Sequence, residues 1–357
     1  MFVAGIDAHT RYVVVVVVNS QGERVLAPTR VALGAPARLL TVLAPFRPLE
    51  AVVETSPSWP WLHEVLTSAG ITFVLAHARK LRAIAEASYK ADAIDAELLA
   101  RMRLAGLIPR VYATPAAQRE WATLIRHRAA LVRARTAAAN RLHAQLHACG
   151  LALKRGQLLT RAGRRWVRER AWPALSVEQR ALVRSHLRLL RGLSQLIRAL
   201  DRRITQVAAP IPEAALLMTI PGIGAHRALL LCAELLPIAR FRTPAHLASY
   251  AGLAPRTAQS GERGIRHGPI PAGANRWLRG AFVRAVVAHV RHAPASALAQ
   301  YYTAQKKRVG WPVARIATAR KLARIVHAML SRHIRWQNGP LPSPRGELHE
   351  THAAQTA

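Results

Sequence analysis

Six consecutive valines, Val13 to Val18, restrict the fold of this chain more than any other segment. Two heavy atoms on the β carbon of valine limit its χ1 rotamers, and the branched side chain packs well on a pleated surface, so such a run favours a strand. The run is too short to cross a bilayer as a helix, which takes about 20 apolar residues. We therefore predict a strand over residues 12–18, beside a first strand over residues 2–7.

Further strands and helices follow in an order that indicates the fold class. We expect short strands near Val25, over residues 49–54 and over residues 71–75, and helices over residues 59–69 and from about 80 to 105. Strands that come first and then alternate with helices are typical of a mixed sheet covered by helices. The prediction for residues 1–115 is therefore an α/β domain.

A helical pattern replaces the strands in residues 116–209. Near the end of this segment, apolar residues recur at spacings of three and four, as in the a/d seam of a coiled coil. The residues of this seam are Leu190, Leu193, Ile197, Leu200, Ile204 and Val207. Together with an earlier helix around residues 121–142, the seam helix could form an antiparallel hairpin or could pair between subunits. Residues 210–337 are predicted to be helical and arginine-rich, and the proline-containing tail, 338–357, to be disordered.

The net charge indicates the class of partner. The chain has 52 lysines and arginines against 18 aspartates and glutamates, a formal charge of +34. Such a surface attracts polyanions, so nucleic acid is the expected partner, with an anionic membrane or the ribosome as lesser alternatives. With 51% hydrophobic residues, the chain has enough apolar material for a folded core.

Cysteine usage and the N-terminus bear on the compartment. Cys149 and Cys232 stand far apart, without clustered histidines, which argues against a zinc site and against a disulfide framework. Asp7 follows Met1 after a short segment without basic residues, so we do not expect a signal peptide. These features fit a cytoplasmic protein without a membrane span.

Carboxylates are scarce enough in this chain to be informative. Three of its four aspartates are Asp7, inside the first predicted strand, and the pair Asp92 and Asp95, while Glu54 ends another strand. An ionised side chain in a strand needs a partner, and residues at i and i+3 share a helix face. Converging carboxylates suit Mg²⁺, which prefers hard oxygen ligands. The competing interpretation is that Asp92 only caps a helix and that Glu54 is a solvated strand end.

A glycine-containing turn precedes an apolar helix in the C-terminal part. Gly222 and Gly224 lie directly before the apolar stretch 228–235. The pattern is similar to a helix-hairpin-helix, in which glycines let backbone N–H groups approach a phosphate at a helix N-terminus. A plain connector between helices is the alternative.

A second loop contains a serine among arginines. Ser260 precedes Gly261, and Arg256, Arg263 and Arg266 surround it in the sequence. These arginines could bind the phosphate of a scissile bond. A serine in a turn is ordinarily only a turn former, so the residues alone do not assign it a catalytic role.

Two sets of motifs occur in order along the chain. The N-terminal set is Gly5-Ile-Asp7, Glu54-Thr55 and Lys90-Ala-Asp92-Ala-Ile-Asp95-Ala96 with Leu99-Ala100. The C-terminal set is Ile220-Pro-Gly-Ile-Gly224, Arg240-Phe241, Leu247 to Pro255, Ser260-Gly261, Gly273 with Asn275, Leu278-Arg279, and Arg320-Lys321-Leu322-Ala323. Over about residues 1–335, the chain thereby resembles the DEDD-type insertion-sequence transposases, which include the pilin-gene invertases and the recombinases guided by a bridge RNA.

This resemblance implies a three-part organisation and a set of site residues. It implies a RuvC-like, ribonuclease H-like domain over residues 1–115, a coiled-coil segment over 116–209 and a transposase domain over 210–337. The implied metal ligands are Asp7, Glu54, Asp92 and Asp95, a tetrad expected to hold two Mg²⁺ ions. The implied nucleophile is Ser260. The residues expected to contact nucleic acid are Gly222, Gly224, Arg256, Arg263, Arg266, Asn275 and Arg279.

The resemblance also implies partners. Its members act on DNA as homo-oligomers, dimers or tetramers, and bind a structured non-coding bridge RNA, which fits a bacterial protein of the cytoplasm and nucleoid. Two positions depart from the pattern: Ala91 replaces a small hydroxyl residue, and the lysine usual before Gly273 is missing. The expected function is a Mg²⁺-dependent DNA recombinase with a serine-linked intermediate. The alternatives are a RuvC-like nuclease that uses water, with Ser260 incidental, and an inactive nucleic-acid-binding remnant of a transposase.

Overall fold

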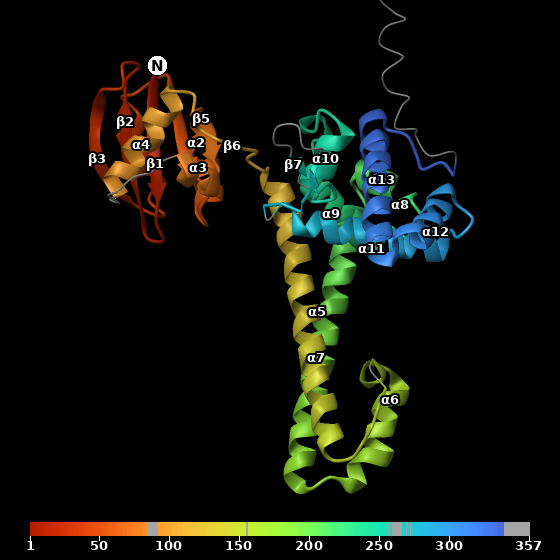
Figure 1. Cartoon of the computed structure of the whole chain (residues 1–357). Coiled ribbons are helices and arrows are strands. Elements are labelled where there is room, and N and C mark those ends of the chain that lie inside the picture. Colours follow the sequence, from red (N-terminus) through yellow and green to blue (C-terminus); the bar gives the residue numbers. More distant parts are fainter. Residues whose placement is uncertain are drawn as a thin grey trace, which may run out of the picture. The chain divides into compact units, whose positions relative to one another are not determined.

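The chain folds into two compact units. The computed structural model describes residues 1–84, 92–154, 156–255, 257–258, 266–268, 270–271 and 273–338. Unit 1 comprises Met1–Ala116 and unit 2 comprises Ala117–Ala357 (Figure 1). The tail predicted to be disordered lies, beyond residue 338, outside the described residues.

Unit 1 is built on one mixed sheet. Its strands are β1 (Phe2–Ala8), β2 (Tyr12–Val18), β3 (Arg24–Ala32), β4 (Leu49–Glu54), β5 (Thr72–Ala76) and β6 (Arg110–Val111), in the order β3-β2-β1-β4-β5-β6. β1 pairs antiparallel with β2 and parallel with β4, which is in turn parallel to β5. The valines of β2 are all buried, because both faces of this strand are covered. The predicted mixed α/β sheet is thus confirmed.

Helices cover both faces of the sheet. They are α1 (Pro36–Leu43), α2 (Trp59–Ser68), α3 (Ala78–Ile84) and α4 (Asp92–Leu104). α1 and α2 pack on the face that carries Ile6 and Val53. α4 packs on the opposite face, which carries Val3 and Val52. The helix predicted from about residue 80 to 105 therefore corresponds to α3 and α4, and residues 85–91 between them lie outside the described part.

Gly5 allows α4 to lie directly on β1. A β carbon at this position would come 1.8 Å from the carbonyl oxygen of Ala96 and 2.9 Å from the amide nitrogen of Ala100. Near the other end of α4, Arg103 forms an ion pair with Glu50 at the start of β4, with Nε and Oε2 2.8 Å apart. These two contacts fix the direction of α4. Its N-terminal end points toward the carboxyl ends of β1 and β4.

Two long helices open unit 2. α5 (Ala116–Ala148) and α7 (Val177–Ala208) run antiparallel, side by side, and the connection between them includes α6 (Arg161–Trp166) (Figure 1). Leu142 of α5 and Leu190 of α7 share one buried cluster, and Ile197 and Ile204 of the predicted seam are buried as well. The chain therefore forms the antiparallel hairpin within itself, and pairing between subunits stays a prediction.

Shorter helices form the rest of unit 2. They are α8 (Pro212–Met218), α9 (Ala225–Leu235), α10 (Pro244–Tyr250), α11 (Arg276–His292), α12 (Ala297–Val309) and α13 (Trp311–Arg332), with a two-stranded ladder of β7 (Thr257–Ala258) and β8 (Arg266–His267). α9 lies in the centre of the core, and its residues 228–235 are all buried. Burial raises the pKa of the Cys232 thiol to about 12, so this cysteine is a core residue. The described helices include none with the length and apolarity needed to cross a membrane.

Replacing Gly5 with alanine should loosen α4 from the sheet. The new β carbon would overlap the backbone of α4, which cannot move aside as a flexible side chain would. Overpacking of a core typically costs about 1–3 kcal/mol. We expect faster hydrogen exchange of the β1 and α4 amides, measured by mass spectrometry on the full chain.

Gly192→Ala is the matched control for this experiment. Gly192 lies inside α7, and apart from the neighbouring backbone of that helix no heavy atom lies within 4 Å of the added methyl group. Alanine should stabilise that helix by about 1 kcal/mol and leave exchange in unit 1 unchanged. Unchanged protection of α4 in Gly5→Ala would contradict the close contact.

Candidate functional site

Two carboxylates meet at one edge of the sheet of unit 1. The parallel pairing of β1 and β4 ends at Ile6 and Val53, so Asp7 and Glu54 follow directly on neighbouring strands. Because side chains alternate along a strand, both point to the face that α4 covers. The side chain of Asp7 is only 19% exposed. The sequence prediction that these two carboxylates share a sheet edge agrees with this register.

The helix α4 brings the two remaining carboxylates toward the same edge. Ala96 and Leu99 of α4 are buried against the sheet, and Asp95 is half-buried next to them. Asp92, the first residue of α4, lies on the same side of the helix, since residues at i, i+4 and i+7 share a face. The side chain of Asp92 is outside the described part of the structure. The backbone of α4 nevertheless directs this end of the helix toward Asp7 and Glu54.

The donor set fits a hard divalent cation. The described part of the structure, which excludes the side chain of Asp92, contains no group of three or more His, Cys, Asp or Glu side chains placed to hold a metal ion. Mg²⁺ is usually held by one or two carboxylates and keeps several waters or substrate phosphates in its coordination shell. The carboxylates of Asp7 and Glu54 therefore supply the oxygen ligands that such a cation requires.

His9 is a member of this edge that sequence reasoning missed. Its Nε2 lies 2.9 Å from Oδ2 of Asp7. The imidazole ring stacks on Tyr12 with 4.6 Å between ring centroids, and the guanidinium of Arg30 lies 3.4 Å from the Tyr12 ring. This stack orients the imidazole, which in turn orients the carboxylate of Asp7. The available sequence signal was a histidine two residues after an aspartate at a strand end.

The segment that contains Ser260 is anchored at both of its ends. β7 and β8 pair through Thr257 with His267 and Ala258 with Arg266. Ser260 belongs to the connection 259–265, which lies outside the described residues, as do Arg256, Arg263 and the side chain of Arg266. Where the segment joins the helices, the backbone N–H of Asn275 donates a hydrogen bond of 3.0 Å to the backbone carbonyl of Tyr250.

Gly252 makes this junction tight. Its φ of +67° favours glycine, and a β carbon there would come 2.7 Å from that of Ala274 and 3.8 Å from Cδ of Arg279. The two ends of the segment thus meet between α10 and α11. Arg279, half-buried in α11, packs at this junction, and its contact with nucleic acid stays a prediction.

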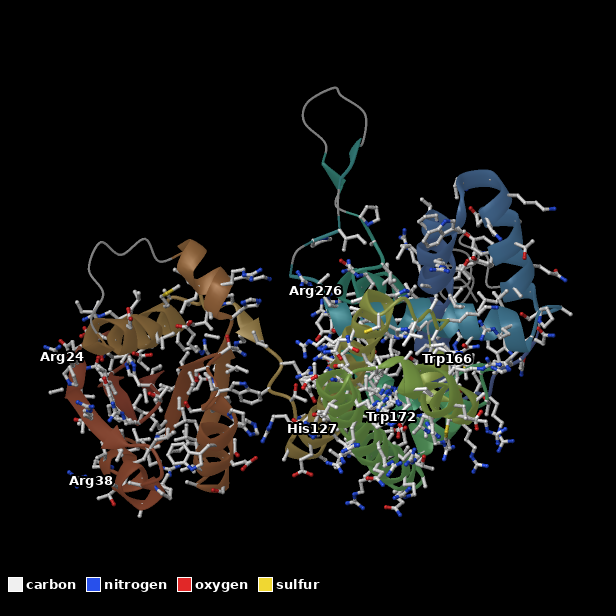
Figure 2. The ribbon with its side chains drawn as sticks, turned by 90° about the horizontal axis from the view of Figure 1, so that it is seen from below. Arg24, Arg38, His127, Trp166, Trp172 and Arg276 are labelled. Carbon is white, nitrogen blue, oxygen red and sulfur yellow. The ribbon has the colours of Figure 1, made fainter. Side chains whose placement is uncertain are left out.

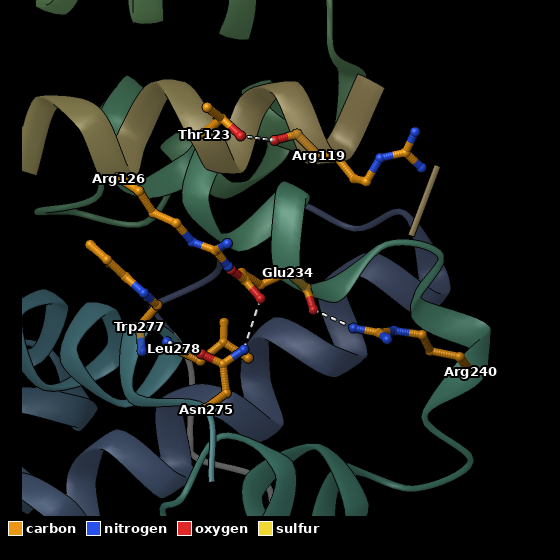
Figure 3. A network of polar contacts seen from close by, with 8 residues as sticks. All are labelled: Arg119, Thr123, Arg126, Glu234, Arg240, Asn275, Trp277 and Leu278. Carbon is orange, nitrogen blue, oxygen red and sulfur yellow. Dashed lines mark hydrogen bonds and ion pairs between the residues drawn. The ribbon is translucent and has the colours of Figure 1, made fainter. Parts of the chain in front are cut away.

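Asn275 connects this junction to a buried glutamate (Figure 3). Its Oδ1 caps α11 by accepting hydrogen bonds from the amides of Trp277 and Leu278, and its Nδ2 donates to Oε2 of Glu234 over 2.8 Å. Glu234 is only 8% exposed, and its Oε1 lies 2.7 Å from Nη2 of Arg126 on α5. A buried carboxylate is stable only when it is paired in this way. The side chain of Asn275 is engaged within the protein, and its predicted contact with nucleic acid stays untested.

The two glycines in the turn before α9 have different roles. A β carbon on Gly222, whose φ is +87°, would lie 2.7 Å from the amide nitrogen of His289, so this glycine is needed for packing against α11. Gly224 caps the N-terminus of α9, is exposed and has open space around it. Of the two, Gly224 is the one that leaves room for a ligand.

A positively charged cavity of about 440 Å³ adjoins this N-terminus. Its lining includes Arg128, Arg227 and Arg284, together with His226. Burial and the neighbouring Arg128 lower the pKa of His226 to about 4, so its ring is neutral at neutral pH. Arg128 is bound to Asp201 of α7 by two hydrogen bonds, of 2.9 and 3.2 Å. The remaining positive charge and the helix N-terminus together suit an anion.

Comparison with known proteins gives matches in both units. A family model described as Transposase IS116/IS110/IS902 family matches residues 214–303, and a model described as Transposase matches residues 4–150. The first range contains Glu234, Ser260 and Asn275, and the second contains the four carboxylates. The side chains in Figure 2, many of them tipped with nitrogen, agree with a charge of +34.

Three relatives illustrate the extent of the similarity. An uncharacterised protein of insertion element IS110 from Streptomyces coelicolor is 38% identical over 31% of this chain and 27% of its own length. The pilin gene-inverting protein of Moraxella bovis is 36% identical over 40% of this chain and 45% of its own length. A probable family 20 transposase of Pseudomonas aeruginosa is 29% identical over 70% of this chain and 75% of its own length. The chain thus spans less than half the length of the first two.

Removal of the Asn275 side chain should release the first turn of α11. Asn275→Ala removes the acceptor for two amides, and loss of such a cap costs about 0.5–2 kcal/mol. We expect faster hydrogen exchange at Trp277 and Leu278. Ser176→Ala is a control, because Ser176 caps α7, far along the chain from Glu234. Undisturbed exchange at the start of α11 would show that the cap does not hold this junction.

Proposed function

We propose that this chain is a transposase of the IS116/IS110/IS902 family, to which its matches point, and that it cuts and rejoins DNA as the recombinase of an insertion sequence. The observation that carries this proposal is the register of β1 and β4, which places Asp7 and Glu54 on neighbouring strands at one sheet edge. Asp7 and Glu54 end neighbouring strands beneath α4, and Asp92 and Asp95 lie at the end of α4 that faces those strand ends.

A RuvC-like, ribonuclease H-like character is proposed for unit 1. The order β3-β2-β1-β4-β5, with β1, β4 and β5 parallel and β2 antiparallel to β1, supports this proposal. Asp7, Glu54, Asp92 and Asp95 would hold Mg²⁺, with two ions proposed. When bound, the metal would stabilise negative charge on the transferring phosphoryl oxygens. His9 would keep the carboxylate of Asp7 in one orientation.

Ser260 is the proposed nucleophile. In this step, a bond forms between its Oγ and phosphorus while the bond from phosphorus to one deoxyribose oxygen breaks. The serine loses its proton, and the departing oxygen takes one up. Attack by a new deoxyribose hydroxyl reverses these changes and rejoins the strand, so the bond energy is retained and no ATP is consumed. The junction of Tyr250, Gly252 and Asn275 joins the two flanks of the stretch that contains Ser260, and this supports the assignment of the stretch to unit 2.

The remaining parts of the proposal concern nucleic acid and assembly. The turn at Gly224 and the positive cavity beside it support a helix-hairpin-helix-like phosphate contact. We propose that Arg256, Arg263, Arg266 and Arg279 contact DNA near Ser260. The charge of +34 fits a structured bridge RNA as a further partner. We also propose that the chain forms homo-oligomers and that the segment 116–209 acts as a coiled coil. Residence in the nucleoid is the last part of the proposal.

Removal of any one of the four carboxylates should abolish strand exchange. Ligands of one metal site act together, so Asp7→Ala, Glu54→Ala, Asp92→Ala and Asp95→Ala are each expected to be inactive while the fold is retained. Recombination between the element's own DNA ends on a plasmid measures the loss. Glu97→Ala is the control, because Glu97 lies on the same helix but pairs with Arg24 and Arg101. Full activity in two of the four variants would remove the tetrad from the reaction.

A covalent bond between Ser260 and DNA distinguishes the recombinase from a hydrolytic nuclease. A suicide substrate should trap the adduct in Mg²⁺, and digestion with mass spectrometry should locate it on the peptide that contains Ser260. The adduct should be absent in Ser260→Ala and present in Ser249→Ala. Strand exchange by Ser260→Ala, or an adduct on Ser249 or Tyr250, would disprove the assignment.

A further inference from the structure

A wide groove in unit 2 is lined by residues of α10, α12 and α13. Its volume is about 980 Å³, near the upper end of the range of roughly 300–1,000 Å³ found for small-molecule pockets. Its walls are mainly apolar. They include Pro244, Leu253, Tyr301, Val313 and Ile316. Side chains of this kind accept a largely apolar group, and the ring of Tyr301 offers a surface on which a planar group can stack.

One wall of the groove is cationic. Arg320, Lys321 and Arg324 line it from α13, and its described lining contains no aspartate or glutamate. The Nζ of Lys321 lies 4.1 Å from the centroid of the Tyr301 ring. Burial, together with the neighbouring Arg324, lowers the pKa of Lys321. An anion at this wall would compensate for the partial loss of hydration of the ammonium group.

The groove borders the segment that contains Ser260. Its lining includes Pro255 and Ile270, which stand on either side of residues 256–269 in the sequence. Whatever occupies the groove therefore lies next to the base of that segment. An occupant with an apolar part and negative charge matches these walls.

We propose that this groove takes up the base of one unpaired DNA nucleotide beside the bond that is cut, with its phosphate on Arg320 and Lys321. This inference rests on the proposed function. Enzymes that act on a nucleotide inside a duplex commonly extrude a base into a pocket, where apolar and aromatic side chains stack on it. The charge of the α13 wall matches the phosphate, and the apolar walls match the base.

Binding of single-stranded DNA tests the proposal without any cleavage. The probe is a short fluorescent oligothymidylate, alone or paired with its complement, added to the full chain carrying Ser260→Ala in the absence of Mg²⁺. Lys321→Gln removes the charge, and Ala317→Leu fills the groove while leaving the charge in place. Each should weaken binding of the single strand about tenfold and leave duplex binding unchanged. Arg332→Gln, which removes an exposed charge at the other end of α13, should have little effect.

A photocrosslink checks the location. A 5-iododeoxyuridine in the oligonucleotide should form a crosslink to Tyr301. This crosslink should be absent in Ala317→Leu. The proposal would be overturned if both variants kept their affinity for oligothymidylate, or if they lost as much affinity for duplex DNA. A larger loss of affinity for oligouridylate RNA than for oligothymidylate would also overturn it. A change of oligomeric state in Ala317→Leu, with unchanged oligothymidylate affinity, would assign the groove to a second copy and overturn it as well.

Failure of the groove proposal and failure of the recombinase assignment can be distinguished. If the Ser260 adduct forms but the groove variants bind the single strand normally, the groove proposal fails and the recombinase stands. If the groove variants lose single-strand affinity but the Ser260 adduct is never found, the recombinase fails and the groove remains a nucleotide site.

Discussion

The contact between α4 and β1 across Gly5 is the interaction on which the proposed metal site at Asp7 and Glu54 depends. A helix normally stands off a sheet by the length of its side chains, but the missing β carbon lets the backbone of Ala96 and Ala100 meet β1 directly. The ion pair of Arg103 with Glu50 then fixes which end of α4 faces the strand ends. Both constraints are needed, since closeness without direction would leave the aspartates of α4 at the wrong end of the sheet.

The scarcity of acidic groups has a matching consequence in unit 2. In a chain with 18 acids and 52 basic residues, a carboxylate finds cationic neighbours readily, and burial is tolerated only where such neighbours are fixed. Glu234 satisfies this condition through Arg126 and Asn275, and it thereby ties α5 to the cap of α11. The few well-placed anions order the elements, and the remaining cations are the groups that the proposed nucleic-acid partner would contact.

Local pattern was enough to predict some of this structure. The valines of β2 and the positions of Asp7 and Glu54 at strand ends follow from residue types and their alternation. Partners distant in the sequence were not predictable, because tertiary packing selects them. Arg126 and Glu234 are separated by 108 positions, and the groove combines residues 243–255 with residues 301–324. The contact of His9 with Asp7 was missed for another reason, since a histidine near a strand end has many ordinary roles.

Anomalous diffraction from crystals grown with Mn²⁺ tests the central claim most directly, because it locates the ion without assuming any activity. The account predicts a peak in contact with the carboxylates of Asp7 and Glu54, beneath the N-terminal end of α4, and its loss in Gly5→Ala, where α4 is displaced. A peak elsewhere in the chain, or none at this edge with Mn²⁺ in excess, would contradict the account.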